Sequence, residues 1–176
     1  MEPNSLAFIA LCNEFCSRLE ALCTGETVDR DEFVSSMLNY IPRLYISATD
    51  LHTLPSLDET DDFISDSWAI ESALDEDYYE AVRRAIEAVM GEDDVYLEVF
   101  EEDMKYSDTP ISASIAEGLA DMFQVLYIFI ETVRDAPNER ISPALSAIKD
   151  DFANYWSRIA CNLLRALNHI RYRDPE

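Results

Sequence analysis

Only three of the 176 residues are glycine, and this scarcity is the feature that most restricts the fold. Folds with many strands use glycine repeatedly in tight turns, because those turns need backbone conformations that other residues adopt at a cost. A chain of this length with so few glycines is therefore expected to be helical. The apolar pattern agrees, since large hydrophobic residues recur at steps of three and four, as they do along one face of an α-helix.

This periodicity predicts helices over residues 5–23, 29–53, 75–90 and 110–135, followed by a long helix that begins at Ser142. Pro42 lies inside the second segment, which is therefore either one kinked helix or two helices that meet near Ile41. Gly91 follows the third segment at the position that glycine favours after a helix. Tyr155 lies on the apolar stripe of the last segment. Together these segments predict an all-α fold, a single-domain bundle of five or six helices over residues 1–176.

Two dipeptides predict where the last two helices begin. Thr109-Pro110 and Ser142-Pro143 each place a capping residue before a proline, which is typical of a helix start.

Val95–Phe100 has the composition of a strand, but its one candidate partner is Leu44–Ile46. We therefore expect a short helix or an irregular segment there, and a loop over residues 54–67.

The charge of the chain excludes several classes of partner. With 13 basic and 36 acidic side chains the formal net charge is −23, whereas phosphate binding needs clustered lysine and arginine. We therefore expect no direct binding to nucleic acid and no attraction to anionic membranes. The start of the chain lacks the basic region of a secretory signal, and no apolar run approaches the roughly 20 residues that span a bilayer. The expected location is the cytoplasm.

The acidic residues are concentrated in the middle third of the chain. Residues 56–110 contain 19 acidic and 3 basic side chains, a net charge of −16, and aromatic residues are interleaved with them. Aromatic side chains are favoured at interfaces, and negative charge steers a basic partner toward its site. The sequence therefore predicts a non-enzymatic binding or interaction module whose middle third contacts a basic protein or peptide. The predicted contact residues are Asp93, Asp94, Tyr96, Glu101, Glu102 and Tyr106.

Two details bear on that prediction. Arg158 and Arg165 are candidates for pairing with the acidic residues inside the monomer, which would consume part of the negative potential. Nucleic-acid mimicry, in which the acidic face occupies a DNA-binding protein, is a third and weaker reading. The sequence leaves the oligomeric state open.

The alternative function is a divalent-metal-dependent hydrolase, such as a phosphohydrolase, that uses carboxylates of the bundle. Its candidate ligands are Glu98, Glu117 and Asp121, because Glu117 and Asp121 share a helix face. A di-iron site is excluded, since neither histidine has a glutamate three residues before it. No glycine-rich phosphate loop and no nucleophile elbow is present, so no catalytic residue and no cofactor is predicted.

The positions of the four cysteines favour a role in core packing over metal binding. Cys12, Cys16 and Cys23 share one face of the first predicted helix, where they alternate with phenylalanine and leucine, and Cys161 lies far along the chain. Structural zinc sites use closely spaced cysteine pairs on turns. The cysteines of the first helix are therefore expected to behave as small apolar core residues.

Two stretches of the chain carry a family resemblance. The sequence NSLAFIALCNEFC at residues 4–16 and the sequence FVSSMLNYIPRLY at residues 33–45 resemble an uncharacterised bacterial family of small acidic all-helical proteins, a domain-of-unknown-function family. The resemblance covers most of the chain and implies a bacterial, cytoplasmic, all-α protein. It supplies no catalytic residue, substrate or cofactor.

Overall fold

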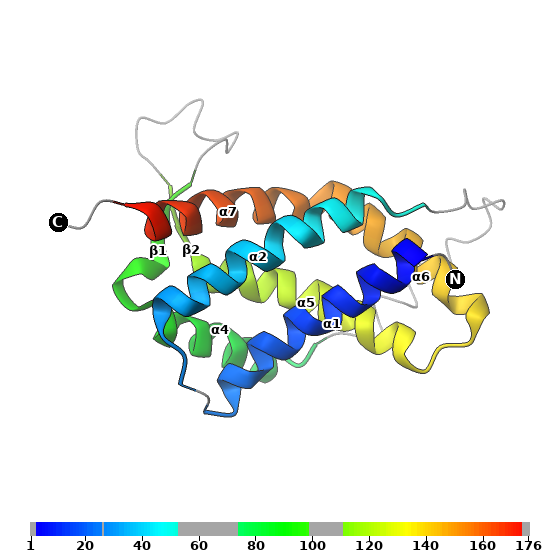
Figure 1. Ribbon diagram of the computed structural model, residues 1–176. Helices are drawn as coiled ribbons and strands as arrows, with labels where there is room; N and C mark the ends of the chain where they lie inside the picture. Colours follow the sequence, from blue (N-terminus) through cyan, green and yellow to red (C-terminus); the bar gives the residue numbers. More distant parts are fainter. Residues whose placement is uncertain (1–2, 26, 53–73, 99–110, 174–176) are drawn as a thin grey trace.

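Long α-helices dominate the computed structural model of the chain, which describes residues 3–25, 27–52, 74–98 and 111–173 (Figure 1). The helices are α1 (Pro3–Cys23), α2 (Arg30–Thr49), α4 (Glu76–Met90), α5 (Ile115–Arg134), α6 (Asn138–Asp151) and α7 (Ser157–Tyr172). A short 3-10 turn, η1 (Gly91–Asp94), follows α4, and a π-helical turn, η3 (Phe152–Trp156), joins α6 to α7. The fold is an all-α bundle, as the periodicity predicts.

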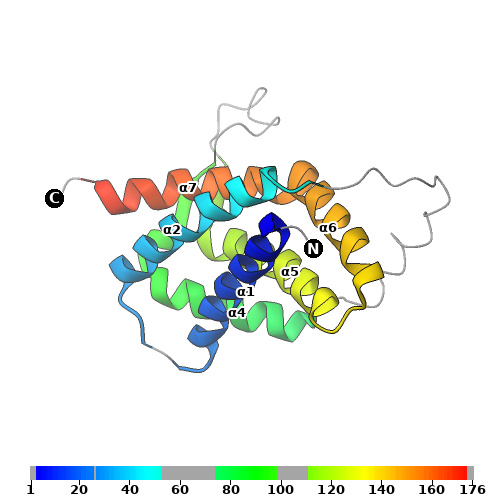
Figure 2. The ribbon, with the colours of Figure 1, turned by 45° about the vertical axis from the view of Figure 1, so that its right-hand side comes forward.

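Helix α5 lies at the centre of the bundle. It packs against α1, α4, α6 and α7, and α2 packs against α7 and α1. In both ribbon views α2 and α7 run side by side, so that the start of α2 lies at the end of α7 (Figures 1 and 2). None of the helices in the described ranges is long and apolar enough to cross a membrane.

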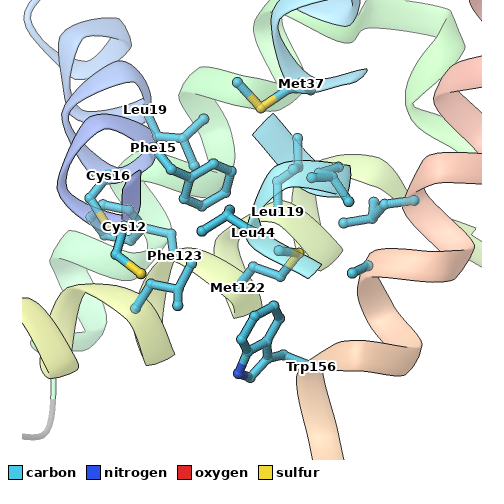
Figure 3. Packing of buried hydrophobic residues seen from close by; sticks show 14 of the residues in the cluster. Cys12, Phe15, Cys16, Leu19, Met37, Leu44, Leu119, Met122, Phe123 and Trp156 are labelled. Atoms are coloured by element: carbon cyan, nitrogen blue, oxygen red, sulfur yellow. The ribbon is translucent and has the colours of Figure 1, made fainter. Parts of the chain in front are cut away.

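The core is one cluster of side chains that every helix of the described structure supplies. The apolar stripe predicted on α1 is buried from Phe8 to Leu22, and its side chains meet residues of α2 and α5 (Figure 3). Each fully buried large apolar side chain contributes about 1.5–3 kcal/mol to folding. The largest buried side chains include Phe15 on α1, Phe33 on α2, Phe123 on α5 and Trp156 on η3.

The start of α2 and the end of α4 follow the sequence closely, whereas α2 ends at Thr49 and not at residue 53. The Asp29 carboxylate accepts hydrogen bonds from the backbone N–H groups of Asp31 and Glu32, at 2.9 and 3.3 Å, and so caps α2. Pro42 is accommodated within a single helix, so the first of the two alternatives for this segment is correct. Gly91 ends α4 with φ of 58°, a left-handed conformation that residues with a Cβ rarely adopt.

The expectation of a helix or irregular segment at residues 95–97 is wrong. Strand β1 (Val95–Leu97) pairs antiparallel with β2 (Ser112–Ser114), with Tyr96 opposite Ala113. The other candidate partner, Leu44–Ile46, lies within α2 instead. The true partner is the tripeptide Ser-Ala-Ser, which has neither the β-branched nor the aromatic residues that signal a strand.

The predicted starts of the last two helices are also wrong. Helix α5 begins at Ile115, not at residue 110, because residues 112–114 are extended by pairing with β1 and Ser114 provides the cap. Helix α6 begins at Asn138 and contains Pro143, so Ser142 is not its cap. The predicted loop at residues 54–67 and the Thr109-Pro110 cap lie outside the described residues.

Candidate functional site

Asp93, one of the predicted contact residues, is held by two arginines of the chain itself. Arg173, just past α7, donates from Nη1 and Nη2 to the two carboxylate oxygens at 2.7 and 3.0 Å, and Arg30, the first residue of α2, donates to the same carboxylate. These bonds, with Arg173 contributing most, hold the pKa of Asp93 below its usual value. The carboxylate therefore joins η1 to the start of α2 and the end of α7.

Asp94, the next residue, is 6% exposed and serves the fold in a different way. Its carboxylate accepts a hydrogen bond from the Ser114 hydroxyl at 2.7 Å and from the Ala116 backbone N–H at 2.7 Å. It therefore satisfies a donor in the first turn of α5, where the helix dipole also favours negative charge. A side chain buried in this way offers no carboxylate oxygen to a partner at the surface.

The other predicted contact residues divide between the strand and the undescribed part of the chain. Tyr96 is half-buried, packs against the core and donates its hydroxyl to Glu98 at 3.2 Å. Glu101, Glu102 and Tyr106 lie outside the described residues. The arginines expected to pair with the acidic segment, Arg158 and Arg165, form no ion pair within the described residues, and Arg30 and Arg173 take that role.

A second group of acidic residues lies on α5, between aromatic side chains from two neighbouring elements. The Tyr79 hydroxyl, on α4, donates to Asp121 at 2.7 Å, and Tyr155 of η3 lies close enough for the Asp121 charge to affect its titration. Glu117 is one helical turn before Asp121 and affects both tyrosines. We call these four residues, Tyr79, Glu117, Asp121 and Tyr155, the Asp121 site.

The electrostatics of the Asp121 site favour a cation. Burial, followed by the hydrogen bond and charge of Asp121, raises the pKa of Tyr79 well above its ordinary value. Burial and the same carboxylate raise the pKa of Tyr155. Both hydroxyls therefore stay protonated at neutral pH and remain donors. Within the described residues no arginine, lysine or histidine forms an ion pair with Glu117 or Asp121, although the positive charge of Arg158 reaches Tyr155.

The arginines of α4 do not compensate this charge, because they are already paired along their own helix. Arg83 bridges Glu80 at 3.1 Å and Glu87 at 3.0 Å, and Arg84 contacts Glu80 at 3.4 Å. These are neighbouring positions on one helix face, where such pairs form readily. The negative charge of Glu117 and Asp121 is therefore left without a salt bridge from the described parts of α4.

The candidate metal ligands do not converge. In the described ranges no three histidine, cysteine, aspartate or glutamate side chains lie where they would hold a metal ion together. Glu117 and Asp121 share a face of α5, but Glu98, which follows β1, does not complete a three-ligand set with them. The two carboxylates of α5 are thus left as a pair that faces tyrosine hydroxyls.

The cysteines follow the sequence reading in part. Cys12 and Cys16 are buried, and burial raises the pKa of both thiols, so they pack as apolar groups and are poorly reactive. Cys23 differs from the expectation, because it is exposed at the last turn of α1. Cys161 is exposed on α7.

Tyr155 is the site residue that sequence reasoning misplaced. The periodicity put it on the buried stripe of one long helix, but its side chain is 40% exposed. The π-helical turn is the cause, since the Ser157 N–H donates to the carbonyl oxygen of Phe152, five residues back, and the face of the helix shifts. Trp156 consequently takes the buried position, and Tyr155 turns toward Asp121. No pattern in the apolar residues signals this turn.

The fold and the Asp121 site define an acidic, all-α helical bundle with an acidic, aromatic surface site. The chain belongs to the family described as "Domain of unknown function (DUF5063)", whose model matches residues 1–173. This confirms the resemblance seen in the sequence to a family of unknown function. No curated protein matches the chain.

A solved structure supports the fold. The chain is similar to the crystal structure of protein BF1032 from Bacteroides fragilis, a structural genomics target, with a TM-score of 0.78 and 25% sequence identity. The match covers 99% of this chain and 96% of that chain. A bacterial origin is suggested by that neighbour, whose name gives no activity or ligand.

Proposed function

We propose that the protein is a non-enzymatic binding module that recognises a basic protein partner, with the Asp121 site at the centre of the contact. The observation that carries the proposal is a half-buried carboxylate that two tyrosines face and that no cation within the described residues pairs with. A partly desolvated carboxylate without a counter-ion is a costly arrangement in a monomer. An arginine or lysine from a partner would supply the missing charge.

The chemistry of the site suits the side chain of an arginine or a lysine. Tyr79 donates to one oxygen of Asp121 at 2.7 Å, and the hydroxyl of Tyr155 also interacts with this carboxylate. A carboxylate has about four acceptor positions, so Asp121 and the exposed Glu117 can still accept hydrogen bonds from a partner. A guanidinium group is planar and donates to carboxylates in pairs, and it also stacks on aromatic rings. Tyr79 and Tyr155 provide such rings beside the carboxylate.

The remainder of the negative charge would act at longer range. A net charge of −23 raises the rate at which a basic partner encounters the surface, and this effect weakens as salt is added. Asp93 and Asp94 contribute to that field, but we propose no anchoring role for them, because their carboxylates already accept hydrogen bonds within the chain. The contact is therefore proposed to shift from η1 to α4, α5 and η3.

The test uses a short arginine-containing peptide as probe and an isocharge pair of variants. Asp121→Asn removes the carboxylate of the site, and Asp150→Asn removes an exposed carboxylate on α6 that has no described ion pair. We expect Asp121→Asn to weaken peptide binding about tenfold, since a hydrogen bond to a charged group is worth about 1.5–3 kcal/mol. Asp150→Asn should change the affinity only slightly.

Isothermal titration calorimetry at low and at physiological salt measures the affinity of both variants for the peptide. Equal small losses in the two variants would mean that the peptide responds to diffuse charge, and the Asp121 site would then not be an anchor. Amide NMR spectra of each variant establish that the fold is retained.

A further inference from the structure

A polar groove opens at the end of the bundle where α2 begins and α7 ends. Its cavity volume is about 1050 Å³ and it is half open to solvent, so it is wide enough to admit a small molecule. The groove is lined by the last turn of α7, by the junction of α4 with η1 and by the start of α2. In Figure 1 the start of α2 and the junction of α4 with η1 lie beneath the C-terminal end of α7. The groove shares no residue with the Asp121 site.

Most of the charged groups in the groove are already engaged with one another. Arg30 and Arg173 hold Asp93, as described above, and Arg30 also contacts Asp31 at 3.0 Å. The carboxylate of Asp29 caps α2. These groups form the framework of the groove and leave little net charge of their own.

Two opposite charges in the lining have no ion pair within the described residues. Arg171 lines the groove from α7, and Glu92 lines it from η1. Both are exposed, and they are not bridged to each other. His169 lies beside Arg171 in the α7 wall, and the apolar side chains Val89, Met90 and Ile170 also contribute to the lining. The groove thus offers a cation on one wall, an anion on another and an apolar surface.

We infer that this groove binds a small zwitterionic ligand, either a free amino acid or a short peptide, with its carboxylate at Arg171 and its ammonium group at Glu92. A guanidinium group binds a carboxylate with two parallel hydrogen bonds, and a glutamate accepts from an ammonium group. A ligand with both charges leaves the electrostatic balance of the groove unchanged. A purely anionic ligand would face Glu92, Asp31 and the chain's large negative charge.

The apolar part of the lining adds to the selectivity that this ligand would experience. Met90 is buried, whereas Val89 and Ile170 are half-buried and pack against the core, so their positions are fixed by the bundle. A small aliphatic side chain placed on them would remove apolar area from water at about 25 cal/mol per Å². Alanine and its dipeptide are therefore suitable probes.

The experiment is an amide NMR titration of the full chain with four probes. L-alanine and L-alanyl-L-alanine carry both charges, and they distinguish a free amino acid from a peptide as the source of the ligand. N-acetyl-alanyl-alanine lacks the ammonium group, and alanyl-alanine amide lacks the carboxylate. We expect a zwitterionic probe to shift the amide signals of Gly91 and Arg171, which line the groove, and each blocked probe to bind about tenfold more weakly.

Two pairs of variants complete the test. Arg171→Gln and Glu92→Gln should each weaken binding of the zwitterion about tenfold, because each removes one charged hydrogen-bonding partner. Arg158→Gln on α7 and Asp150→Asn on α6 make the same charge changes outside the groove and should leave the affinity unchanged. The inference is overturned if neither zwitterion shifts these amides, if the blocked probes bind equally well, or if the groove variants match their controls.

Discussion

The acidic residues of η1 and those of α5 differ in the groups that contact their carboxylates. Asp93 is enclosed by Arg30 and Arg173, and Asp94 is buried against donors at the start of α5. Asp121, in contrast, accepts from the Tyr79 hydroxyl, Glu117 affects the titration of the same tyrosine, and neither carboxylate has an ion pair within the described residues. The first pair holds the fold together, and the second pair keeps its charge available. The density of acidic residues in a stretch of sequence therefore does not show which of them a partner can reach.

The largest expected effect is on stability, at Asp94. Asp94→Ala removes a buried carboxylate that accepts from Ser114 and Ala116, and it leaves a helix N–H and a hydroxyl without their acceptor. We expect the free energy of unfolding to fall by about 2–4 kcal/mol, the sum of a lost cap and a lost charged hydrogen bond. Urea unfolding followed by circular dichroism measures it. A loss below about 0.5 kcal/mol, the size of an ordinary surface effect, would remove Asp94 from the structural group.

A smaller loss is expected at Asp93, with a characteristic pH dependence. Asp93→Asn should cost about 1–2 kcal/mol, because the arginines that hold the carboxylate are themselves partly exposed. The pKa of Asp93 is lowered in the folded state, so its contribution is complete above the unfolded pKa of about 3.9 and disappears as the pH falls through the folded value.

The stability difference between the wild type and Asp93→Asn should consequently be constant from pH 5 to pH 8 and narrow in strong acid. Parallel urea titrations from pH 8 down into strong acid provide the measurement. A difference that instead grows toward acid pH would show that the carboxylate is not stabilised by its arginines.

The raised pKa of Tyr79 predicts a further loss at alkaline pH. Burial and Asp121 disfavour the tyrosinate in the folded state, so the stabilising contribution is present below the unfolded pKa of about 10 and is lost as the pH rises above it. Asp121→Asn should move the Tyr79 pKa back toward its ordinary value. Absorbance of tyrosinate in the wild type and in Asp121→Asn tests this, and identical titration curves would contradict the contact.

The smallest expected effect is at Tyr155, which is 40% exposed. Tyr155→Phe keeps the ring and removes the hydroxyl, so the free energy of unfolding should change by about 0.5 kcal/mol or less. Binding of the arginine-containing peptide should fall by less than it does in Asp121→Asn, because the ring remains for the guanidinium to stack on. Calorimetry on the two variants makes this comparison, and equal losses would give the hydroxyl a direct role.

The helices were predictable because their apolar stripes repeat over many residues. The stripe on α1, the start of α2 and the glycine after α4 lie close to where the sequence puts them. The β1–β2 pair was not predictable, because strand pairing depends on a distant partner and Ser112–Ser114 carries no strand signal of its own. The extended residues of β2 also moved the start of α5.

The types of residue in the candidate site were predictable from the sequence, but the contacts between them were not. The sequence shows acidic and aromatic residues together in the middle third, and Tyr79 is among them. It does not show that Asp93 meets Arg30 and Arg173, which are 63 and 80 residues away along the chain. It also gives no sign of the π-helical turn that brings Tyr155 to Asp121. Both contacts depend on how distant elements pack.

The most direct test of the contrast between the two acidic groups is to measure Asp93→Asn and Asp121→Asn side by side, in urea unfolding and in binding of the arginine-containing peptide. We expect Asp93→Asn to lose about 1–2 kcal/mol of stability and to keep its affinity, whereas Asp121→Asn should bind about tenfold more weakly and unfold nearly as the wild type does. Loss of binding in Asp93→Asn, with Asp121→Asn binding normally, would contradict it and return the contact to η1.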